Sequence, residues 1–292
     1  MVYLVLVSLI WAVSFGLIKA TLGGVDADFS SWARLFLGFL IFLPFLRPRA
    51  LPGRTVLFLV LVGALQYGVM YQLYFRAFSF LAAWEVVLFT IFTPVYVTLL
   101  NDLRTKTFHR RFFLAALLAV LAGGWIYWTD QLRGEIWTGF LMMQASNLCF
   151  AFGQVAYREV MQQHPKVPDR TVFGWLFAGA VLLSGIGVTV FGDWGAATTL
   201  SAQQIGVLFF LGVIATGGGF FGWNVGARKV SAGTLAVMNN LKVPLGIFVA
   251  LTLFRESAEG GRLLVSFFLI IAALWVSGEL HPRREKEKTA EG

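Results

Sequence analysis

The sequence predicts an all-α integral membrane protein whose ten transmembrane helices form two inverted five-helix repeats around a central cavity. Of its 292 residues, 58% are hydrophobic and only 13% are charged, whereas soluble domains carry roughly 25% charged residues. Apolar segments recur along the whole chain, and each is long enough to cross roughly 30 Å of hydrocarbon. Corresponding residues also recur at a fixed offset in the two halves.

The apolar segments are expected to be helices, because an open strand in lipid would leave its backbone groups unpaired. Short connectors join them and leave no room for a large soluble domain. The first segment has no basic leader or cleavage site, so we interpret it as a retained span. The final residues, 281–292, are charged and poor in apolar side chains, which predicts a disordered cytoplasmic tail. The expected spans are 2–20, 30–46, 56–75, 81–100, 112–129, 137–157, 171–191, 204–226, 231–254 and 263–280.

Lys and Arg residues fall mainly in alternate connectors. Cytoplasmic loops of membrane proteins are enriched in these residues, so both termini are predicted to be cytoplasmic and the protein to lie in the cell (inner) membrane. The net charge of +8 forms no basic face, which argues against a nucleic-acid partner. The cations on the predicted cytoplasmic side are Arg47, Arg49, Arg54, Arg104, Lys106, Arg110, Arg111, Arg158, Lys166, Arg170, Arg228, Lys229, Arg283, Arg284, Lys286 and Lys288, against Lys19, Arg76, Arg133, Arg255 and Arg262 outside.

A shift of 150 positions superposes parts of the two halves, most tellingly Pro94 on Pro244 and Trp125 on Trp275. We therefore expect one five-helix repeat with its connector at 1–136 and a second at 137–280. Five is an odd number of spans, so the second repeat enters the membrane from the opposite side, an arrangement found in transporters with a site between the repeats. The two prolines are candidate hinges; a static kink is the alternative.

Lys242 is the strongest candidate for a substrate-binding residue. It lies near the middle of the ninth span, where a charge costs roughly 2.5–3.5 kcal/mol on insertion scales, and Asn239 lies on the same helix face. A lysine that lines a wet cavity could bind a substrate carboxylate. The alternative is an internal structural ion pair.

The corresponding face of the fourth span carries Glu85, Phe89, Phe92 and Tyr96. These aromatic side chains could form an apolar wall opposite Lys242, although an aromatic stripe also suits helix packing. Glu85 lies near the outer surface, where it could receive an ammonium or a proton, or simply face water.

Further polar or aromatic candidates for substrate contact are Tyr71, Asn147 and Trp223. Buried amides must find partners within the membrane, so interhelical hydrogen bonding is the alternative for these residues. Arg34 lies near the outer end of its span, and we expect it to be interfacial or to form a structural pair.

The ten spans, Arg34 in the second, the proline-bearing fourth and ninth, and Glu256 after the ninth together resemble the EamA family of the drug/metabolite transporter superfamily, over about residues 2–280. Within it the chain is most similar to the bacterial YddG-type exporters of aromatic and other neutral amino acids. The resemblance implies a ten-helix basket, alternating access and export from the cytoplasm. One departure is Lys106, which stands where Glu256 would recur in the first half.

We therefore expect an alternating-access exporter of small amino-acid-like metabolites, with an amino acid and the lipid bilayer as its partners and able to act as a monomer. The alternatives are a carrier of a nucleotide-sugar or organic anion, an intramembrane lipid-modifying enzyme, or a passive channel. No cofactor or metal site is expected, because the single Cys149 lies in an apolar span. An enzyme is disfavoured, since His109, His164 and His281 all lie outside the spans.

Overall fold

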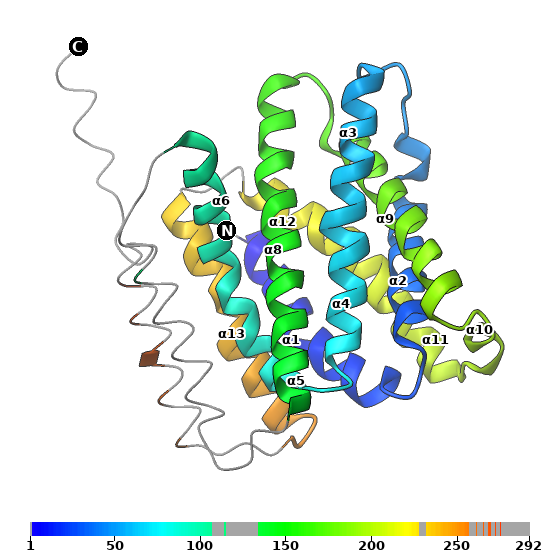
Figure 1. Ribbon diagram of the computed structural model, residues 1–292, viewed down its shortest axis with the longest axis vertical. Coiled ribbons are helices and arrows are strands. Elements are labelled where there is room, and N and C mark those ends of the chain that lie inside the picture. The colour runs from blue at the N-terminus through cyan, green and yellow to red at the C-terminus, as the bar shows by residue number, and fades with distance from the viewer. Residues whose placement is uncertain are drawn as a thin grey trace.

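The computed structural model describes residues 2–106, 134–227 and 232–256, together with the single positions 114, 261, 265, 268, 269, 272 and 275. Within these ranges the regular secondary structure is helical (Figure 1). The longer elements are α1 (Val2–Leu22), α2 (Ala27–Phe42), α3 (Gly53–Gly63), α4 (Met70–Ala77), α5 (Ala83–Phe89), α6 (Thr93–Thr105), α8 (Gly134–Gln163), α9 (Asp169–Phe191), α11 (Ala202–Phe209), α12 (Gly219–Ala227) and α13 (Ala232–Thr252), with the short η1 (Leu43–Phe45) and α10 (Ala196–Thr199).

Six helical segments in the described ranges are long and apolar enough to span a membrane, which confirms the membrane class. They are Val2–Leu22, Ala27–Phe45, Gly53–Ala77, Ala83–Arg104, Asp169–Phe191 and Ala202–Gly226. The helices α8 and α13 coincide with the sixth and ninth expected spans. The fifth and tenth expected spans, 112–129 and 263–280, and the tail 281–292 lie outside the described residues apart from single positions, so the total of ten crossings stays a prediction.

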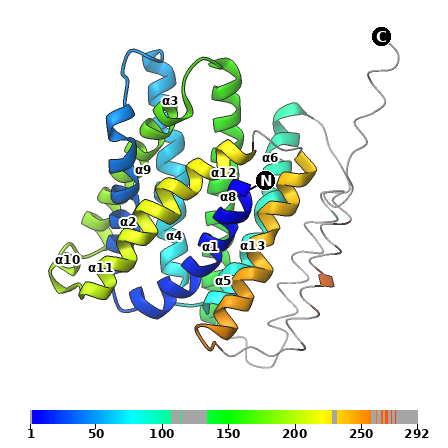
Figure 2. The same ribbon diagram turned by 180° about the vertical axis from the view of Figure 1, so that it is seen from behind.

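The first helix of each half packs against helices of the other half (Figures 1 and 2). In the first half, α1 contacts α12 and α13; in the second half, α8 contacts α4 and α6. The helices α2 and α9 lie against each other at one side of the bundle (Figures 1 and 2). This arrangement brings α1, α2, α4, α6, α8, α12 and α13 around one interior space.

The third and eighth spans each contain a π-helical segment, which sequence periodicity did not predict. The first is η2 (Ala64–Val69), between α3 and α4, and the second is η4 (Phe210–Gly218), between α11 and α12. Close backbone contacts accompany η2: a Cβ on Gly63 would lie 1.8 Å from the Leu176 carbonyl oxygen, and one on Gly179 would lie 1.8 Å from the Val60 carbonyl oxygen. Only glycine permits this approach of α3 to α9.

The fourth span is interrupted, whereas the ninth is a continuous helix with Pro244 inside it. A 3₁₀ turn, η3 (Thr90–Phe92), separates α5 from α6, and Pro94 lies in the first turn of α6. The Thr93 N–H bonds the Thr90 carbonyl, as expected where a proline cannot continue the α-helical ladder. The structure thus places a break at Pro94; whether either proline acts as a hinge stays a prediction.

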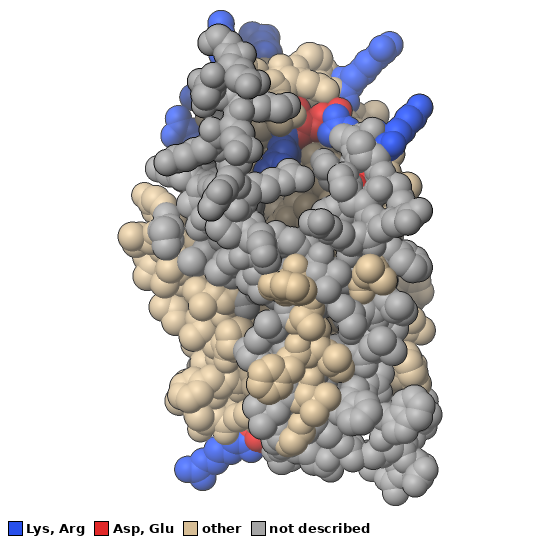
Figure 3. All heavy atoms as spheres, turned by 90° about the vertical axis from the view of Figure 1, so that its left-hand side faces the viewer, with Lys and Arg blue, Asp and Glu red and all other residues tan. Residues whose placement is uncertain are grey.

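The charged side chains gather at one end of the bundle. Figure 3 shows Lys and Arg side chains concentrated at the end where α3 begins and α6 and α8 finish. At the opposite end, Arg76 forms an ion pair with Asp28 (2.7 Å), and the Lys19 ammonium donates to the carbonyls of Phe78 and Leu81. The end rich in cations is the one predicted to face the cytoplasm.

Candidate functional site

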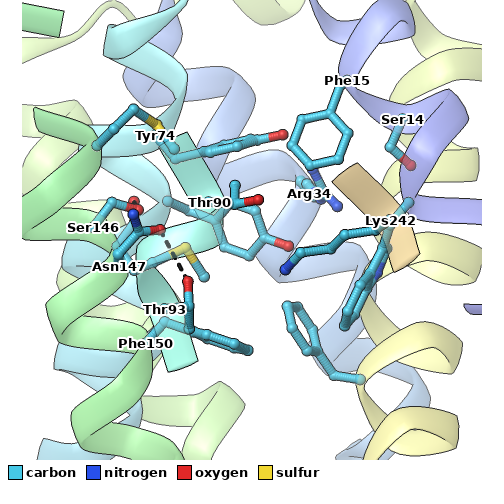
Figure 4. A pocket seen from close by; sticks show the side chains of 15 residues that line it. Ser14, Phe15, Arg34, Tyr74, Thr90, Thr93, Ser146, Asn147, Phe150 and Lys242 are labelled. Atoms are coloured by element: carbon cyan, nitrogen blue, oxygen red, sulfur yellow. Dashed lines mark hydrogen bonds between the residues drawn. The ribbon is translucent and has the colours of Figure 1, made fainter. Parts of the chain in front are cut away.

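A cavity lies between the two halves in the interior of the bundle (Figure 4). About 580 Å³ of atom-free space lies between its walls, part of it open to solvent. The residues that line it come from α1, α2, α4, η3, α6, α8, α12 and α13: Trp11, Ser14, Phe15, Arg34, Met70, Tyr71, Tyr74, Thr90, Thr93, Met143, Ser146, Asn147, Phe150, Phe220 and Lys242.

Arg34 lines this cavity, which corrects the expectation that it would be interfacial or held in a structural pair. Its side chain is 3% exposed. Its Nε donates to Thr216, and its guanidinium carbon lies 4.5 Å from the centre of the Tyr71 ring. The Nη1 nitrogen finds no hydrogen-bond partner among the described residues. The aromatic ring and the hydroxyl hold the guanidinium in place.

Lys242 lies in the cavity wall, as its depth in the ninth span indicated, and is 6% exposed. Its Nζ lies 5.5 Å from the centre of the Trp11 ring, and the described residues offer it no ion pair. The described lining contains no Asp or Glu. The cavity therefore presents two buried cations without a carboxylate to neutralise them, an arrangement that favours an anionic ligand.

Neutral polar side chains also line the cavity: Thr93, Ser146 and Asn147 lie opposite Arg34 and Lys242, and Thr90 lies between the two groups (Figure 4). The Asn147 amide nitrogen donates to the Phe89 carbonyl at 2.7 Å, and the Thr93 hydroxyl donates to the Asn147 amide oxygen at 3.2 Å. The hydroxyls of Thr90 and Ser146 donate to the carbonyls of Val87 and Met70. The bonds of Asn147 and Ser146 join α8 to α4, α5 and α6, whereas the Thr90 bond stays within the fourth span.

Aromatic rings cover the space between the two polar walls. Trp11 packs against Phe220 with ring centres 5.1 Å apart, and Phe220 packs against Phe150 at 5.6 Å. Phe15 meets Tyr74 edge-on at 6.1 Å. An apolar middle between polar ends suits a ligand with a hydrocarbon segment.

The aromatic face expected on the fourth span does not line the cavity. Phe89 and Phe92 pack edge-on against Phe140 of α8, and the Tyr96 hydroxyl donates to Gln144. The cavity instead receives Thr90 and Thr93, because the 3₁₀ turn changes the direction in which successive side chains point. These three aromatic residues therefore serve helix packing, the alternative that the sequence left open.

Glu85 also lies away from the cavity. Its carboxylate accepts the Ala82 N–H at 2.7 Å at the start of α5, a capping role that its position in the first helical turn explains. The Glu256 carboxylate accepts the N–H groups of Ala83 and Trp84, both at 3.0 Å. Two acids therefore stabilise one helix end.

The remaining expected site residues are placed as follows. Tyr71 and Asn147 line the cavity. Trp223 lies behind the wall, with its ring centre 5.2 Å from that of Trp11. Asn239 lies in α13, but its side chain is outside the described part of the structure.

Sequence reasoning missed several lining residues, of which Arg34 is the most consequential. Its position inside a span was a sufficient signal, since a buried arginine is costly unless it has a role. The lining threonines carried no such signal, because a hydroxyl within a span commonly bonds its own helix.

Comparison with known proteins identifies the family. A model of the EamA-like transporter family matches residues 1–128 and 137–278. The chain belongs to the EamA-like transporter family. The family and the transporter relatives described below make this EamA protein a membrane transporter and not an enzyme, as the sequence indicated.

Curated relatives match this EamA chain over nearly its full length. A biotin transporter of Escherichia coli (strain K12) is 41% identical over 94% of this chain and 92% of its own length. A biotin transporter of Salmonella typhimurium is 39% identical over the same shares, and a probable biotin transporter of Pseudomonas aeruginosa is 42% identical over 94% of this chain and 96% of its own. A crystal structure of a protein 17% identical in sequence, covering 98% of each chain, superposes with a TM-score of 0.67 and shows the fold alone.

Proposed function

We propose that this EamA-family protein carries biotin across the cell (inner) membrane. The single observation that supports this most strongly is the pair of buried cations, Arg34 and Lys242, in a cavity whose described lining holds no Asp or Glu. Biotin is a monocarboxylate with a hydrocarbon chain and a ring urea. Its carboxylate would neutralise the cationic wall, and its chain would contact the aromatic rings.

The relatives support the same substrate. Three of them, between 39% and 42% identical, are named biotin transporters or probable biotin transporters. None of these names supports the amino acid export that we expected from the sequence. An amino acid would also need a place for its ammonium beside its carboxylate, and the described cavity wall near Arg34 offers no acid for it.

The transport mechanism that we propose is alternating access between two inverted repeats, 1–136 and 137–280. The family model matches in two separate segments, and the first helix of each half, α1 or α8, contacts helices of the other half. The third and eighth spans are both 25 residues long and both contain a π-helical segment. We further propose that both termini are cytoplasmic and that the protein works as a monomer, because a single chain supplies the described cavity wall.

Counterflow in proteoliposomes tests the substrate. Purified protein is reconstituted into liposomes loaded with unlabelled biotin, and the uptake of external labelled biotin is followed. We expect transient accumulation of the label that excess biotin abolishes and that phenylalanine or tryptophan leaves unchanged. Counterflow of the aromatic amino acids without counterflow of biotin would overturn the proposal.

Matched lysine variants connect the assay to the cavity. We expect Lys242→Ala to abolish biotin counterflow, because it removes one of the two buried cations. Lys166→Ala, which changes an exposed connector lysine, is the control and should transport at the wild-type rate. Equal rates in the two variants would remove Lys242 from the site.

A further inference from the structure

We propose that Thr90, Thr93, Ser146 and Asn147 form a subsite for the ring-urea end of the substrate, opposite the carboxylate-binding wall of Arg34 and Lys242. This inference rests on the proposed function and adds to it the direction in which the ligand lies. A ring urea presents two N–H donors and one carbonyl acceptor. The four side chains offer the complementary set.

The hydroxyl groups act as acceptors toward the cavity, because each has already used its single proton. Thr90 donates to the Val87 carbonyl at 2.7 Å, and Ser146 donates to the Met70 carbonyl at 3.1 Å. Carbonyl oxygens only accept, so the direction of both bonds is fixed. The remaining lone pairs of these oxygens suit the N–H groups of a urea.

Asn147 supplies the donor. Its amide nitrogen must face the Phe89 carbonyl, which can only accept, and its amide oxygen then faces the Thr93 hydroxyl. Thr93 has therefore also donated its proton and keeps acceptor capacity. An amide nitrogen has two protons, and the bond to the Phe89 carbonyl uses one of them. The second proton is the one that would bind the urea carbonyl.

The break in the fourth span makes this arrangement possible. In a regular α-helix the Thr93 N–H would bond the Phe89 carbonyl. In this helix the 3₁₀ turn directs it to the Thr90 carbonyl, and the Asn147 side chain bonds the Phe89 carbonyl instead. The subsite is thereby held by backbone geometry before any ligand arrives, which lowers the cost of ordering it on binding.

The position of the two walls fixes the class of ligand. Figure 4 shows Asn147, Ser146 and Thr93 on the side of the cavity opposite Arg34 and Lys242, with Thr90 between the two groups. An amino acid such as phenylalanine has all of its polar groups on one carbon, so it would leave the polar side chains of one wall unpaired. A ligand with a carboxylate and a neutral N–H-bearing ring at opposite ends of an aliphatic chain could reach both walls.

Competition between two carboxylates tests the subsite. Biotin and lipoate share a carboxylate on the same aliphatic chain, but lipoate has a disulfide ring in place of the fused thioether and urea rings of biotin. Each is titrated against labelled biotin bound to purified, reconstituted protein. We expect the wild-type protein to prefer biotin about tenfold or more, because lipoate leaves the polar wall unpaired.

The variants then separate the two ends of the ligand. Thr93→Val and Thr90→Val should each weaken biotin binding about tenfold and leave lipoate binding unchanged. The ratio of the affinity for biotin to the affinity for lipoate should therefore fall toward one. Thr93→Ser keeps the hydroxyl and should keep the preference. Arg34→Gln should weaken both ligands alike. Thr252→Val, which alters an exposed hydroxyl bonded to the Phe248 carbonyl, should change neither.

The outcomes distinguish this inference from the proposed function. A wild-type protein that neither binds nor transports biotin would overturn the proposed function and with it the subsite. A wild-type protein that transports biotin but binds lipoate as tightly would overturn the subsite alone. The same holds if Thr93→Val and Thr90→Val weaken biotin and lipoate equally.

Discussion

The guanidinium carbon of Arg34 lies 4.5 Å from the centre of the Tyr71 ring, and its Nε donates to Thr216 of η4. One element from each half therefore holds this cation: Tyr71 belongs to the third span and Thr216 to the eighth. Under the proposed function, this rigid and planar guanidinium would bind the carboxylate of biotin.

Replacing Arg34 should show that its shape is needed as well as its charge. We expect Arg34→Lys to raise the KM for biotin about tenfold, because an ammonium loses the ring stacking and the fork of donors. Arg34→Gln should abolish transport. Initial rates of counterflow at varied biotin concentrations measure both effects. Arg170→Lys alters an exposed arginine stacked on Phe45 and serves as the control. A normal KM in Arg34→Lys would show that charge alone suffices.

Replacing Lys242 should separate function from stability. We expect Lys242→Met to lose biotin transport while the unfolding temperature in detergent stays level or rises, because a buried charge without a counter-ion costs folding free energy. Differential scanning fluorimetry measures the temperature. If Lys242→Met lost transport and also unfolded earlier, Lys242 would have a structural role instead.

The contact between α3 and α9 should tolerate no side chain at Gly179. Its Cβ would lie 1.8 Å from the Val60 carbonyl oxygen, and a backbone atom cannot move aside cheaply. We expect Gly179→Ala to lower the yield of monodisperse protein several-fold, with a destabilisation of roughly 1–3 kcal/mol from overpacking. Gly206→Ala adds the same methyl group where no atom lies within 4 Å and should be neutral. Equal yields of the two variants, measured by size-exclusion chromatography, would contradict the contact.

The carboxylate of Glu256 should stabilise the start of α5, which is far from it in the sequence. It accepts the N–H groups of Ala83 and Trp84 at the start of α5, so Glu256→Ala leaves two donors unpaired and should destabilise the protein by about 1–3 kcal/mol. The matched change Glu159→Ala removes a partly exposed pair with Arg104 and should cost less than about 1 kcal/mol. Thermal unfolding of both variants provides the comparison. A larger loss in Glu159→Ala would contradict this ranking.

The topology should place the connectors 46–52 and 78–82 on opposite sides of the membrane. Single cysteines at Arg49 and Ser79 in a Cys149→Ser background are probed with an impermeant thiol reagent on intact cells. We expect only the cysteine at Ser79 to react, because the cation-rich end faces the cytoplasm. Fluorescent protein fused after Gly292 should be active in the cytoplasm. Reaction of the cysteine at position 49 alone would show that the protein has the opposite orientation in the membrane.

The sequence was sufficient for the membrane class and for the depth of Lys242. Hydropathy reports how deep a residue lies, because each span must match the hydrocarbon thickness. Hydropathy says less about the direction in which each face of a helix points. The face of Phe89 and Phe92 was assigned to the cavity by regular helical spacing, but the 3₁₀ turn at Thr90 rotates the chain, and no periodicity reveals that turn.

The substrate was harder to predict than the fold. The chemistry of the cavity depends on Arg34, and its position near the outer end of its span suggested an interfacial residue or a structural pair. Only the packing of α2 against η4 and α4 shows that its side chain turns inward to Thr216 and Tyr71. The donors and acceptors that the neutral polar side chains present depend on which carbonyl each hydroxyl proton bonds. These bonds follow from tertiary geometry, which cannot be read from composition.

The uncompensated pair of cations also bears on the rate of each half of the transport cycle. An empty carrier must reorient with two positive charges in a medium of low dielectric constant, whereas a carrier loaded with a monoanion moves only one net charge. The empty return should therefore be the slow step. Homoexchange of biotin should consequently be faster than net flux down a gradient, and a voltage across the bilayer should alter the second more than the first.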